Sequence, residues 1–167
     1  MELYVLRHGI AQPREALCSM KDSDRALTKE GAQKMRRIAK GMKALGLSFD
    51  AILTSPFRRA KQTANIVAET LRLKKRMEIV AALAAGERTK SLIEALENFP
   101  KNVERILIVG HEPDLSCLVS RLVTGGPNLA VNFKKGALCK LTLNSIRHGR
   151  CAILEWLLAP GQLARIR

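Results

Sequence analysis

The chain of 167 residues has few cysteines, and their spacing predicts no structural role for them. Its four cysteines (Cys18, Cys117, Cys139 and Cys151) are scattered, and no two of them form a CxxC pair. Zinc sites and disulfide frameworks are recognised by closely or regularly spaced cysteines. We therefore expect no metal site, and we interpret the cysteines as free thiols of a reducing compartment.

Long hydrophobic runs are also missing. No apolar stretch approaches the roughly 20 residues that a membrane-spanning helix requires. The first residues, MELYVLRHG, carry Glu2 where a signal peptide has basic residues, and their apolar stretch is short. We therefore expect a cytoplasmic protein that makes no contact with a membrane.

Acidic and aromatic residues are scarce. The chain has 15 Asp and Glu against 29 Lys and Arg, a net charge of +14, and only 4% of its residues are aromatic. Such a field attracts nucleic acids, phosphorylated proteins and acidic metabolites. The few aromatic residues leave little for bases to stack on, and no basic run accompanies a recognised nucleic-acid motif. Nucleic acid is therefore the least favoured of these partners.

What the sequence does have is a regular alternation of apolar patterns. Apolar residues make up 47% of the chain, which excludes a disordered protein. Runs of strand length alternate with segments whose apolar residues recur at helical spacing. This alternation predicts an α/β fold, a three-layer α/β/α sandwich with a mostly parallel central sheet. The last two strands are joined without a helix and are expected to add an antiparallel edge.

We expect one domain that covers residues 1–167. Thr28 is predicted to cap the first helix and Gly46 to end it. Ser55 is predicted to cap the second helix, with Pro56 in its first turn. The predicted strands are 2–7, 51–55, 78–80, 105–110, 137–143 and 152–158. The predicted helices are 29–45, 55–71, 91–98 and 113–122.

Polar residues follow three of the predicted strands. They are the clusters Arg7-His8-Gly9, Ser55-Pro56 with Arg58 and Arg59, and Gly110-His111. Ligands of open α/β sheets bind beyond the carboxyl ends of the strands, so neighbouring strands would bring these groups into one pocket. The predicted helix start at Pro56 would add N–H groups that attract anions. Because Glu112 is the only acid beside these clusters, the sequence predicts a pocket for a dianion.

The motifs resemble those of the histidine phosphatase superfamily, which includes phosphoglycerate mutases and histidine acid phosphatases. The resemblance lies in Leu6–Gly9, in the run SPFRRAKQTA that begins at Ser55, and in the late Gly110-His111. The short chain and the segment DRALTKEG, which begins at Asp24, are similar to the small SixA-type phosphohistidine phosphatases of that superfamily.

The resemblance implies a role for each of these residues. His8 would be the nucleophile, Arg7 and Arg59 would bind the phosphoryl oxygens, and His111 would contact the phosphoryl group opposite His8. Neutral imidazole is a competent nucleophile, provided that its second nitrogen donates to an acceptor such as a backbone carbonyl near Gly9. No metal or other cofactor would be needed.

Other residues near these motifs have two open interpretations. Gly9 allows a tight turn or a close approach of the backbone. Ser55 either binds phosphate or only caps its helix, and Arg25 and Arg14 are either substrate-binding residues or surface residues. Arg58 shares its predicted helix face with exposed residues, and His148 lies in a polar turn, so we expect both to be outside the site.

A proton donor for an alkoxide leaving group is missing from the expected place. The stretch after the predicted strand 78–80 has no acid before Glu87, which we interpret as a solvated loop residue. A pocket without an acid favours phosphohistidine on a protein as the substrate. The alternatives are a phosphatase of small phosphoesters or nucleotides, and a phosphate-dependent binding protein without turnover.

Overall fold

The computed structural model describes residues 1–13, 21–100 and 102–167. Its centre is a six-stranded sheet with the strand order β3-β2-β4-β1-β5-β6. Neighbouring strands from β3 to β1 are parallel, and β5 runs antiparallel to β1 and β6. The strands are β1 (Glu2–Arg7), β2 (Ala51–Thr54), β3 (Met77–Ile79), β4 (Arg105–Gly110), β5 (Leu138–Leu143) and β6 (Ala152–Leu158). The predicted parallel sheet with an antiparallel edge is confirmed.

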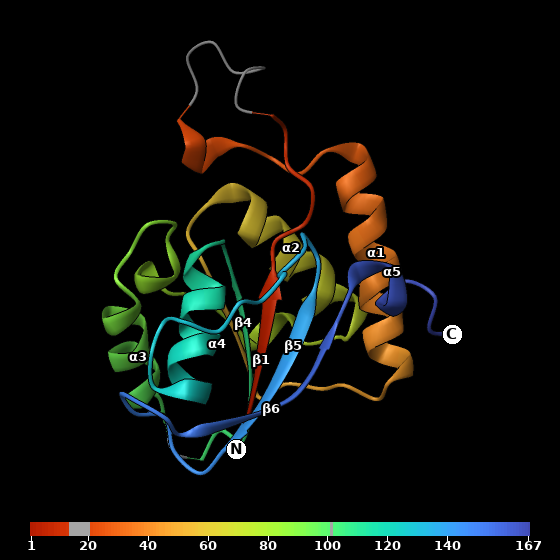
Figure 1. Ribbon diagram of the computed structural model, residues 1–167. Helices are drawn as coiled ribbons and strands as arrows, with labels where there is room; N and C mark the ends of the chain where they lie inside the picture. The colour runs from red at the N-terminus through yellow and green to blue at the C-terminus, as the bar shows by residue number, and fades with distance from the viewer. Residues whose placement is uncertain (14–20, 101) are drawn as a thin grey trace.

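Helices cover both faces of this sheet (Figure 1). The α-helices are α1 (Lys29–Ala44), α2 (Arg58–Thr70), α3 (Thr89–Glu97), α4 (Asp114–Thr124) and α5 (Pro160–Leu163). The 3-10 helices are η1 (Asp22–Asp24), η2 (Lys74–Arg76) and η3 (Ala81–Leu83). None of the helices in these described ranges is long and apolar enough to cross a membrane.

Alternate residues of the central strands build the two halves of the core. In β1, Leu3 and Val5 join the cluster on the side of α3 and α4, whereas Tyr4 and Leu6 join the cluster on the side of α1 and α2. Successive side chains of a strand point to opposite faces, so a strand that is apolar at every position must be covered twice. The predicted three-layer sandwich is therefore present.

The ends of α1 agree with the sequence signals, but the start of α2 does not. Thr28 Oγ1 accepts the N–H of Gly31 at 2.9 Å, and Gly46 has the left-handed φ of 70° that often follows a helix end. The prediction that Ser55 caps the second helix was wrong, because α2 begins only at Arg58. The Ser55 N–H donates to Val109 O at 3.0 Å and prolongs the strand pairing, so the chain turns after Pro56.

Candidate active site

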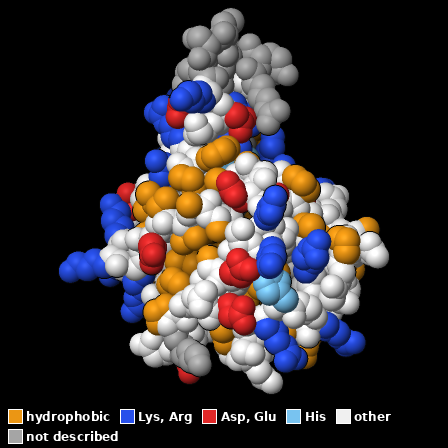
Figure 2. Space-filling view, turned by 90° about the vertical axis from the view of Figure 1, so that its left-hand side faces the viewer, with side chains coloured by type: hydrophobic (Ala, Val, Ile, Leu, Met, Phe, Trp, Pro, Cys, Tyr) orange, Lys and Arg blue, Asp and Glu red, His pale blue; other side chains and the backbone are white. Residues whose placement is uncertain are grey.

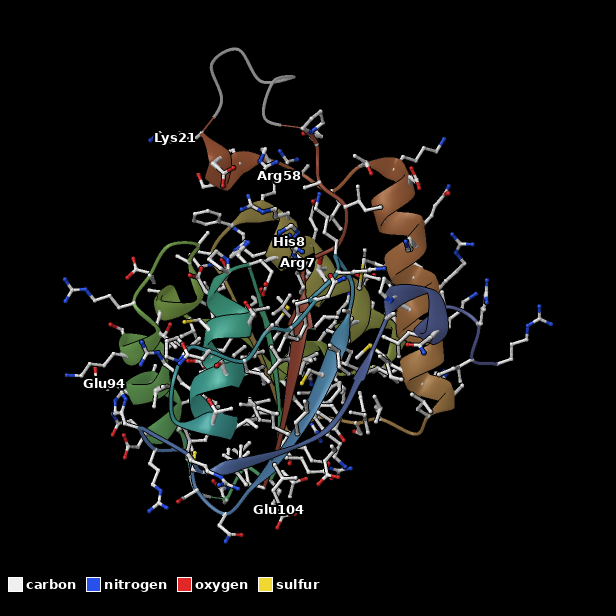
Figure 3. The ribbon with its side chains drawn as sticks, in the orientation of Figure 1. Arg7, His8, Lys21, Arg58, Glu94 and Glu104 are labelled. Carbon is white, nitrogen blue, oxygen red and sulfur yellow. The ribbon has the colours of Figure 1, made fainter. Side chains whose placement is uncertain are left out.

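The three polar clusters come together at one end of the sheet because β2, β4 and β1 are neighbours. Arg7 is the last residue of β1, and the N–H of His8 donates to the carbonyl of Gly110, the last residue of β4, at 3.1 Å. Figure 3 shows Arg7 and His8 at this end of the sheet, with Arg58 and Lys21 beyond them. The predicted convergence is therefore present.

His8 is held with one ring nitrogen available. Its Nδ1 lies 2.7 Å from the carbonyl oxygen of Gly9. A carbonyl can only accept, so Nδ1 carries the proton in the neutral ring and Nε2 keeps its lone pair. Arg59 Nε donates toward this Nε2 at 3.3 Å, which agrees with the same tautomer. The carbonyl expected near Gly9 is thus the carbonyl of Gly9 itself.

The position of Gly9 leaves no room for a side chain. A Cβ at Gly9 would lie 2.7 Å from Cγ of Met35 in α1. The Gly9 N–H donates to Thr63 Oγ1 at 3.1 Å, and Thr63 Oγ1 donates to the carbonyl of Arg59 at 2.8 Å. Of the two interpretations of Gly9, the structure shows the close approach. Thr63 ties this backbone to α2, a contact that the sequence pattern did not reveal.

Arg59 lies on the inner face of α2, as the helical spacing predicted. It is 3% exposed, whereas the neighbouring Arg58 is exposed. The Arg59 guanidinium lies 5.0 Å from the ring centroid of Phe57, so one face of it rests on an aromatic side chain. Its donors point toward His8 and toward η1, and the guanidinium is therefore fixed beside the ring of His8.

His111 faces His8 across the site. The ring centroids are 5.0 Å apart, and the exposed fractions are 2% for His111 and 6% for His8. Its Nε2 lies 2.8 Å from Ser55 Oγ, which itself accepts the N–H of Phe57 at 3.2 Å. If Ser55 donates its hydroxyl proton to Nε2, the proton of His111 lies on Nδ1. That Nδ1 is buried and has no hydrogen-bond partner among the described residues. Ser55 therefore positions His111 rather than capping a helix.

Arg7 and Arg25 also carry buried donors without a hydrogen bond among the described residues. Arg7 Nη1 donates to the carbonyl of Phe133 at 2.7 Å, but the buried Arg7 Nε has no hydrogen-bond partner. Arg25 Nε is likewise without a hydrogen bond, although it forms an ion pair with Asp22. Unsatisfied buried donors are costly, and those of Arg7 and His111 suit an anion that can accept from both.

Burial keeps both histidines neutral. Desolvation lowers the pKa of His8 to about 3, against an opposing effect of the hydrogen bond to Gly9. Desolvation, followed by the positive charge of Arg59, lowers the pKa of His111 to about 3. Burial also lowers the pKa of Arg7, and the charge of Glu112 opposes that change. At neutral pH the site thus holds two neutral imidazoles among arginines.

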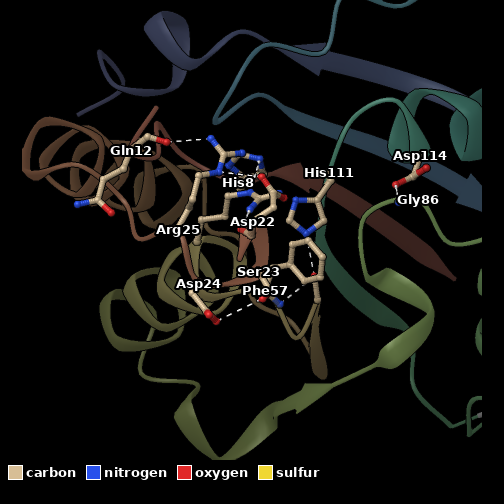
Figure 4. Close-up of polar contacts among 12 residues, drawn as sticks. His8, Gln12, Asp22, Ser23, Asp24, Arg25, Phe57, Gly86, His111 and Asp114 are labelled. Carbon is tan, nitrogen blue, oxygen red and sulfur yellow. Dashed lines mark hydrogen bonds and ion pairs between the residues drawn. The ribbon is translucent and has the colours of Figure 1, made fainter. Parts of the chain in front are cut away.

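Glu112 is the acid that lies beside the three sequence clusters, and the fold brings a second acid, Asp22, to the site. Asp22 of η1 pairs with Arg59 Nη2 at 3.0 Å, and its backbone carbonyl accepts from Arg59 Nη1 at 2.7 Å. Figure 4 shows Asp22 together with His8 and Arg25. Arg25 joins the same group: its Nε forms an ion pair with Asp22 Oδ1 at 2.9 Å, too bent to count as a hydrogen bond. Asp22 lies in a segment without periodicity, so the sequence offered no signal for its position.

Two residues considered from the sequence do not join this group. Glu87 follows η3 and is exposed, as expected of a solvated loop residue. His148 is also exposed and lies 4.0 Å from Glu94 of α3, away from the strand ends. Arg14 and Cys18 lie outside the described residues. Within the described ranges, no three His, Cys, Asp or Glu side chains are grouped so that they could hold a metal ion.

The fold and the site define an α/β protein with a neutral histidine and arginine donors at the carboxyl ends of parallel strands. A family model for the histidine phosphatase superfamily (branch 1) matches residues 3–84. The phosphohistidine phosphatase SixA of Escherichia coli K12 is 30% identical over 166 residues, which are 98% of this chain and 96% of SixA. The chain belongs to the histidine phosphatase superfamily.

Solved structures agree with this membership. The structure of the protein histidine phosphatase SixA complexed with tungstate is 28% identical and has a TM-score of 0.83, with 98% of this chain and 99% of that chain covered. A phosphoserine phosphatase from Entamoeba histolytica shares the fold, with 17% identity and a TM-score of 0.72 over 97% of this chain and 98% of that one.

Proposed function

We propose that the protein is a metal-independent phosphatase that forms a phosphohistidine intermediate on His8. The observation that carries this proposal is the unprotonated Nε2 of His8, which faces Arg59 Nε at 3.3 Å while Nδ1 is held by its hydrogen bond to the carbonyl of Gly9. An activated nucleophile needs such an orienting partner on its second nitrogen. The low pKa of His8 keeps the lone pair of Nε2 available over the whole physiological range.

The reaction has two steps. In the first, His8 Nε2 forms a bond to phosphorus while the bond to the leaving group breaks, and the leaving group takes up a proton. In the second, water attacks the phosphorus and the bond to Nε2 breaks, so that His8 returns to its neutral form. The proton that the water loses passes to the phosphate or to solvent, and phosphate leaves. Phosphoryl transfer depends mainly on positioning and on stabilisation of charge. Arg7, Arg59 and His111 would supply that stabilisation, and Ser55 would orient His111.

The similar SixA structure supports an anion at this place. Tungstate, which that protein binds, is a tetrahedral dianion like phosphate. In this chain, Arg7 Nε and His111 Nδ1 are the buried donors that a bound phosphoryl group would satisfy. A site of neutral imidazoles and guanidinium groups suits such a dianion without a metal, and the proposed mechanism requires none.

As substrate we propose phosphohistidine on a protein. An alkoxide leaves only with a proton donor, which contributes about 10²–10⁴ in rate. Of the acids near the described site, Glu87 is exposed, both carboxylate oxygens of Asp22 are paired with arginines, and Glu112 Oε1 accepts the N–H of Ser116 at 3.0 Å. We therefore assign none of them as a dedicated proton donor. The imidazole of a phosphohistidine can be protonated near neutral pH before the bond breaks. Similarity to SixA supports the same choice.

A small phosphoester is the second candidate substrate. The burial of His8, Arg59 and His111 favours it, because a deeply buried site admits a small molecule more easily than a side chain of another protein. The fold is also that of a phosphoserine phosphatase. A phosphate-dependent binding protein without turnover would require that His8 never becomes phosphorylated.

A trapping experiment tests the nucleophile. The protein is mixed briefly with a ³²P-labelled phosphohistidine protein in the presence of EDTA and quenched without acid. We expect label on His8 that is stable in alkali and labile in acid, and no label in His8→Ala. The control is His148→Ala, which removes an exposed histidine and should label normally. Label that persists in His8→Ala, or that needs a divalent ion, contradicts the mechanism.

A substrate panel then separates the candidates. We expect kcat/KM to be higher for a phosphohistidine protein than for a phosphoserine peptide or a small alkyl phosphate, all at one salt concentration. If the alkyl esters react as well or better, and Glu87→Gln abolishes that reaction, the small-phosphoester candidate replaces ours.

A further inference from the structure

An acidic side chain lies where the site is expected to bind an anion. Asp22 Oδ2 is 3.0 Å from Arg59 Nη2, and Asp22 Oδ1 is 2.9 Å from Arg25 Nε. Asp22 is only partly buried, but the guanidinium that it contacts is almost completely buried. A buried guanidinium needs a compensating charge, and in the free protein Asp22 provides it.

The carboxylate takes the edge of Arg59 that a phosphoryl group would use. The Nε and Nη2 hydrogens of a guanidinium point the same way and form the fork that binds two oxygens of one anion. In this structure Nε faces His8 Nε2 at 3.3 Å and Nη2 faces Asp22 Oδ2 at 3.0 Å. Asp22 Oδ2 is therefore placed beside the nucleophilic nitrogen, in the position expected of a phosphoryl oxygen.

Asp22 also lies near the other side of the site. Its negative charge raises the pKa of His111, against the larger lowering by burial and by Arg59. The 3-10 helix η1 that carries Asp22 contacts α2, and its backbone carbonyl at Asp22 accepts from Arg59 Nη1. His8, Arg59 and His111 are all buried, and the contact between Asp22 and Arg59 adjoins the hydrogen bond from Arg59 Nε to His8 Nε2.

We propose that Asp22 is a positioning residue whose carboxylate stands in for a phosphoryl oxygen on Arg59 and is displaced when phosphate binds. The proposal rests on the proposed function, since it assumes that Arg59 receives the phosphoryl group. Two consequences follow. Arg59 stays oriented toward His8 while the site holds no substrate. The apparent affinity for any phosphoryl ligand is lowered by the fraction of molecules in which Asp22 is paired.

This competition applies to the product as well as to the substrate. Inorganic phosphate needs the same fork of Arg59, so a returning carboxylate weakens its hold and favours its release. Exchange of one anion for another involves no covalent change. Arg25, which pairs with the other carboxylate oxygen and donates from Nη1 to the carbonyl of Gln12 at 2.8 Å, keeps Asp22 close enough to return.

Direct binding of inorganic phosphate tests the proposal without relying on turnover. Titration calorimetry gives the dissociation constant of wild type, Asp22→Asn and Asp24→Asn. We expect Asp22→Asn to bind phosphate about five- to tenfold more tightly than wild type. This factor corresponds to a wild-type protein in which the state with Asp22 paired to Arg59 is populated about five- to tenfold more than the state with Arg59 open to phosphate. Asp24 lies in the same 3-10 helix and is exposed, and its Oδ1 accepts the hydroxyl of Ser23 at 3.3 Å. Asp24→Asn removes the same charge and should change the dissociation constant less than twofold.

Thermal unfolding supplies the second readout. Without phosphate, Asp22→Asn should melt below wild type, because the buried Arg59 loses its counter-charge. Phosphate should raise the melting temperature of Asp22→Asn more than that of wild type, because the stabilisation by a ligand that binds only the folded state grows with the logarithm of its concentration divided by its dissociation constant. A merely structural role of Asp22 would lower the stability without tightening phosphate binding.

Each outcome decides between the two proposals. Failure of wild type to bind phosphate overturns the proposed function. If wild type binds phosphate but Asp22→Asn binds it equally or more weakly, only the role of Asp22 is wrong. If Asp22→Asn stays unfolded even in saturating phosphate, the anion does not replace the carboxylate, and the role of Asp22 is again wrong.

Discussion

Arg59 is the residue through which most contacts of the candidate site pass. It donates to His8, it pairs with Asp22, and its guanidinium rests on Phe57. Its planar fork of donors matches the oxygens of a phosphoryl group, and a lysine at this place would offer only a point charge. Neutral His8 and His111 add no charge of their own, so the arginines carry the attraction for the substrate.

The adjacent residues Arg58 and Arg59 at the start of α2 allow a matched test. Arg59→Ala should lower kcat by about 10²–10³, the usual effect of losing one preorganised donor that stabilises the transition state. Arg58→Ala should change kcat little, since Arg58 is exposed on the opposite face of the same helix turn. Steady-state kinetics on the best substrate of the panel compares the two. An equal or reversed ranking would mean that Arg59 does not bind the phosphoryl group.

At the residue scale, the sequence predicted the direction of side chains on regular helices and strands, and it missed the positions of side chains in irregular segments. Helical spacing was sufficient to place Arg59 inward and Arg58 outward. Ser55 was assigned to a helix cap because Ser-Pro is a common helix start, and a hydrogen bond to Val109 across the sheet overrode that local preference. Asp22 lies in a 3-10 helix within a loop, where spacing carries no information about direction.

At the scale of elements, adjacent parallel strands bring the candidate residues together. Alternation of strands and helices predicted a parallel sheet, and the residues after its strands could therefore be expected at one edge. The order of the strands is a different matter. It depends on how α1, α2 and α4 pack on the two faces, and no local pattern in the sequence specifies that packing.

The packing of α1 on α5 depends on a helix glycine. A Cβ at Gly41 would lie 1.9 Å from the carbonyl oxygen of Leu163. This oxygen belongs to the backbone, so no change of rotamer can relieve the clash. Gly41→Ala should therefore destabilise the protein by roughly 1–3 kcal/mol, the usual cost of overpacking, although alanine is the better helix former.

Gly161 in α5 is the control, because a Cβ there meets nothing within 4 Å. Gly161→Ala should leave the free energy of unfolding unchanged or raise it slightly. Urea unfolding of both variants makes the comparison. Because the α1–α5 contact is not among the residues around His8, we expect kcat to stay within about twofold for the folded fraction of Gly41→Ala. Equal stability of the two variants would show that α5 can move away from α1.

At the scale of the whole molecule, the net charge of +14 is the main feature, and on the face that Figure 2 shows this charge is spread rather than gathered. Figure 2 shows Lys and Arg side chains over one face with Asp and Glu among them. A distributed charge of +14 raises the association rate of an acidic partner. It does little to direct that partner to one particular binding site. Steering of this kind is screened by salt, since the Debye length falls from roughly 10 Å at 0.1 M to roughly 3 Å at 1 M.

This charge predicts a salt dependence that differs between substrates. Between 50 and 500 mM NaCl, kcat/KM for an acidic phosphohistidine protein should fall more steeply than kcat/KM for a small phosphoester. The reason is that a protein substrate interacts with the whole field and a small ester mainly with the site. Parallel slopes for the two would contradict a role of the overall charge in recognition of the substrate.

The two buried histidines make the stability of the whole molecule depend on pH. In the folded protein the pKa of His8 and that of His111 are each about 3, whereas an unfolded histidine titrates near 6.5. Below pH 6.5 the unfolded chain binds protons that the folded chain does not, so protonation favours unfolding. The free energy of unfolding is therefore not reduced by these two histidines above pH 6.5, and it decreases as the pH falls from 6.5 toward 3.

His8→Gln should reduce this loss. Each histidine that titrates only on unfolding contributes up to about 1.4 kcal/mol per pH unit to the slope of stability against pH. Urea unfolding at pH 4, 5, 6 and 7 gives that slope for wild type, for His8→Gln and for the exposed-residue control His148→Gln. We expect His8→Gln to flatten the profile between pH 4 and 6 by about one proton, whatever it does to the stability at pH 7, and the control to flatten it less. Unchanged slopes in His8→Gln would mean that His8 takes up its proton over the same pH range in the folded and the unfolded protein, which would contradict a pKa lowered by burial.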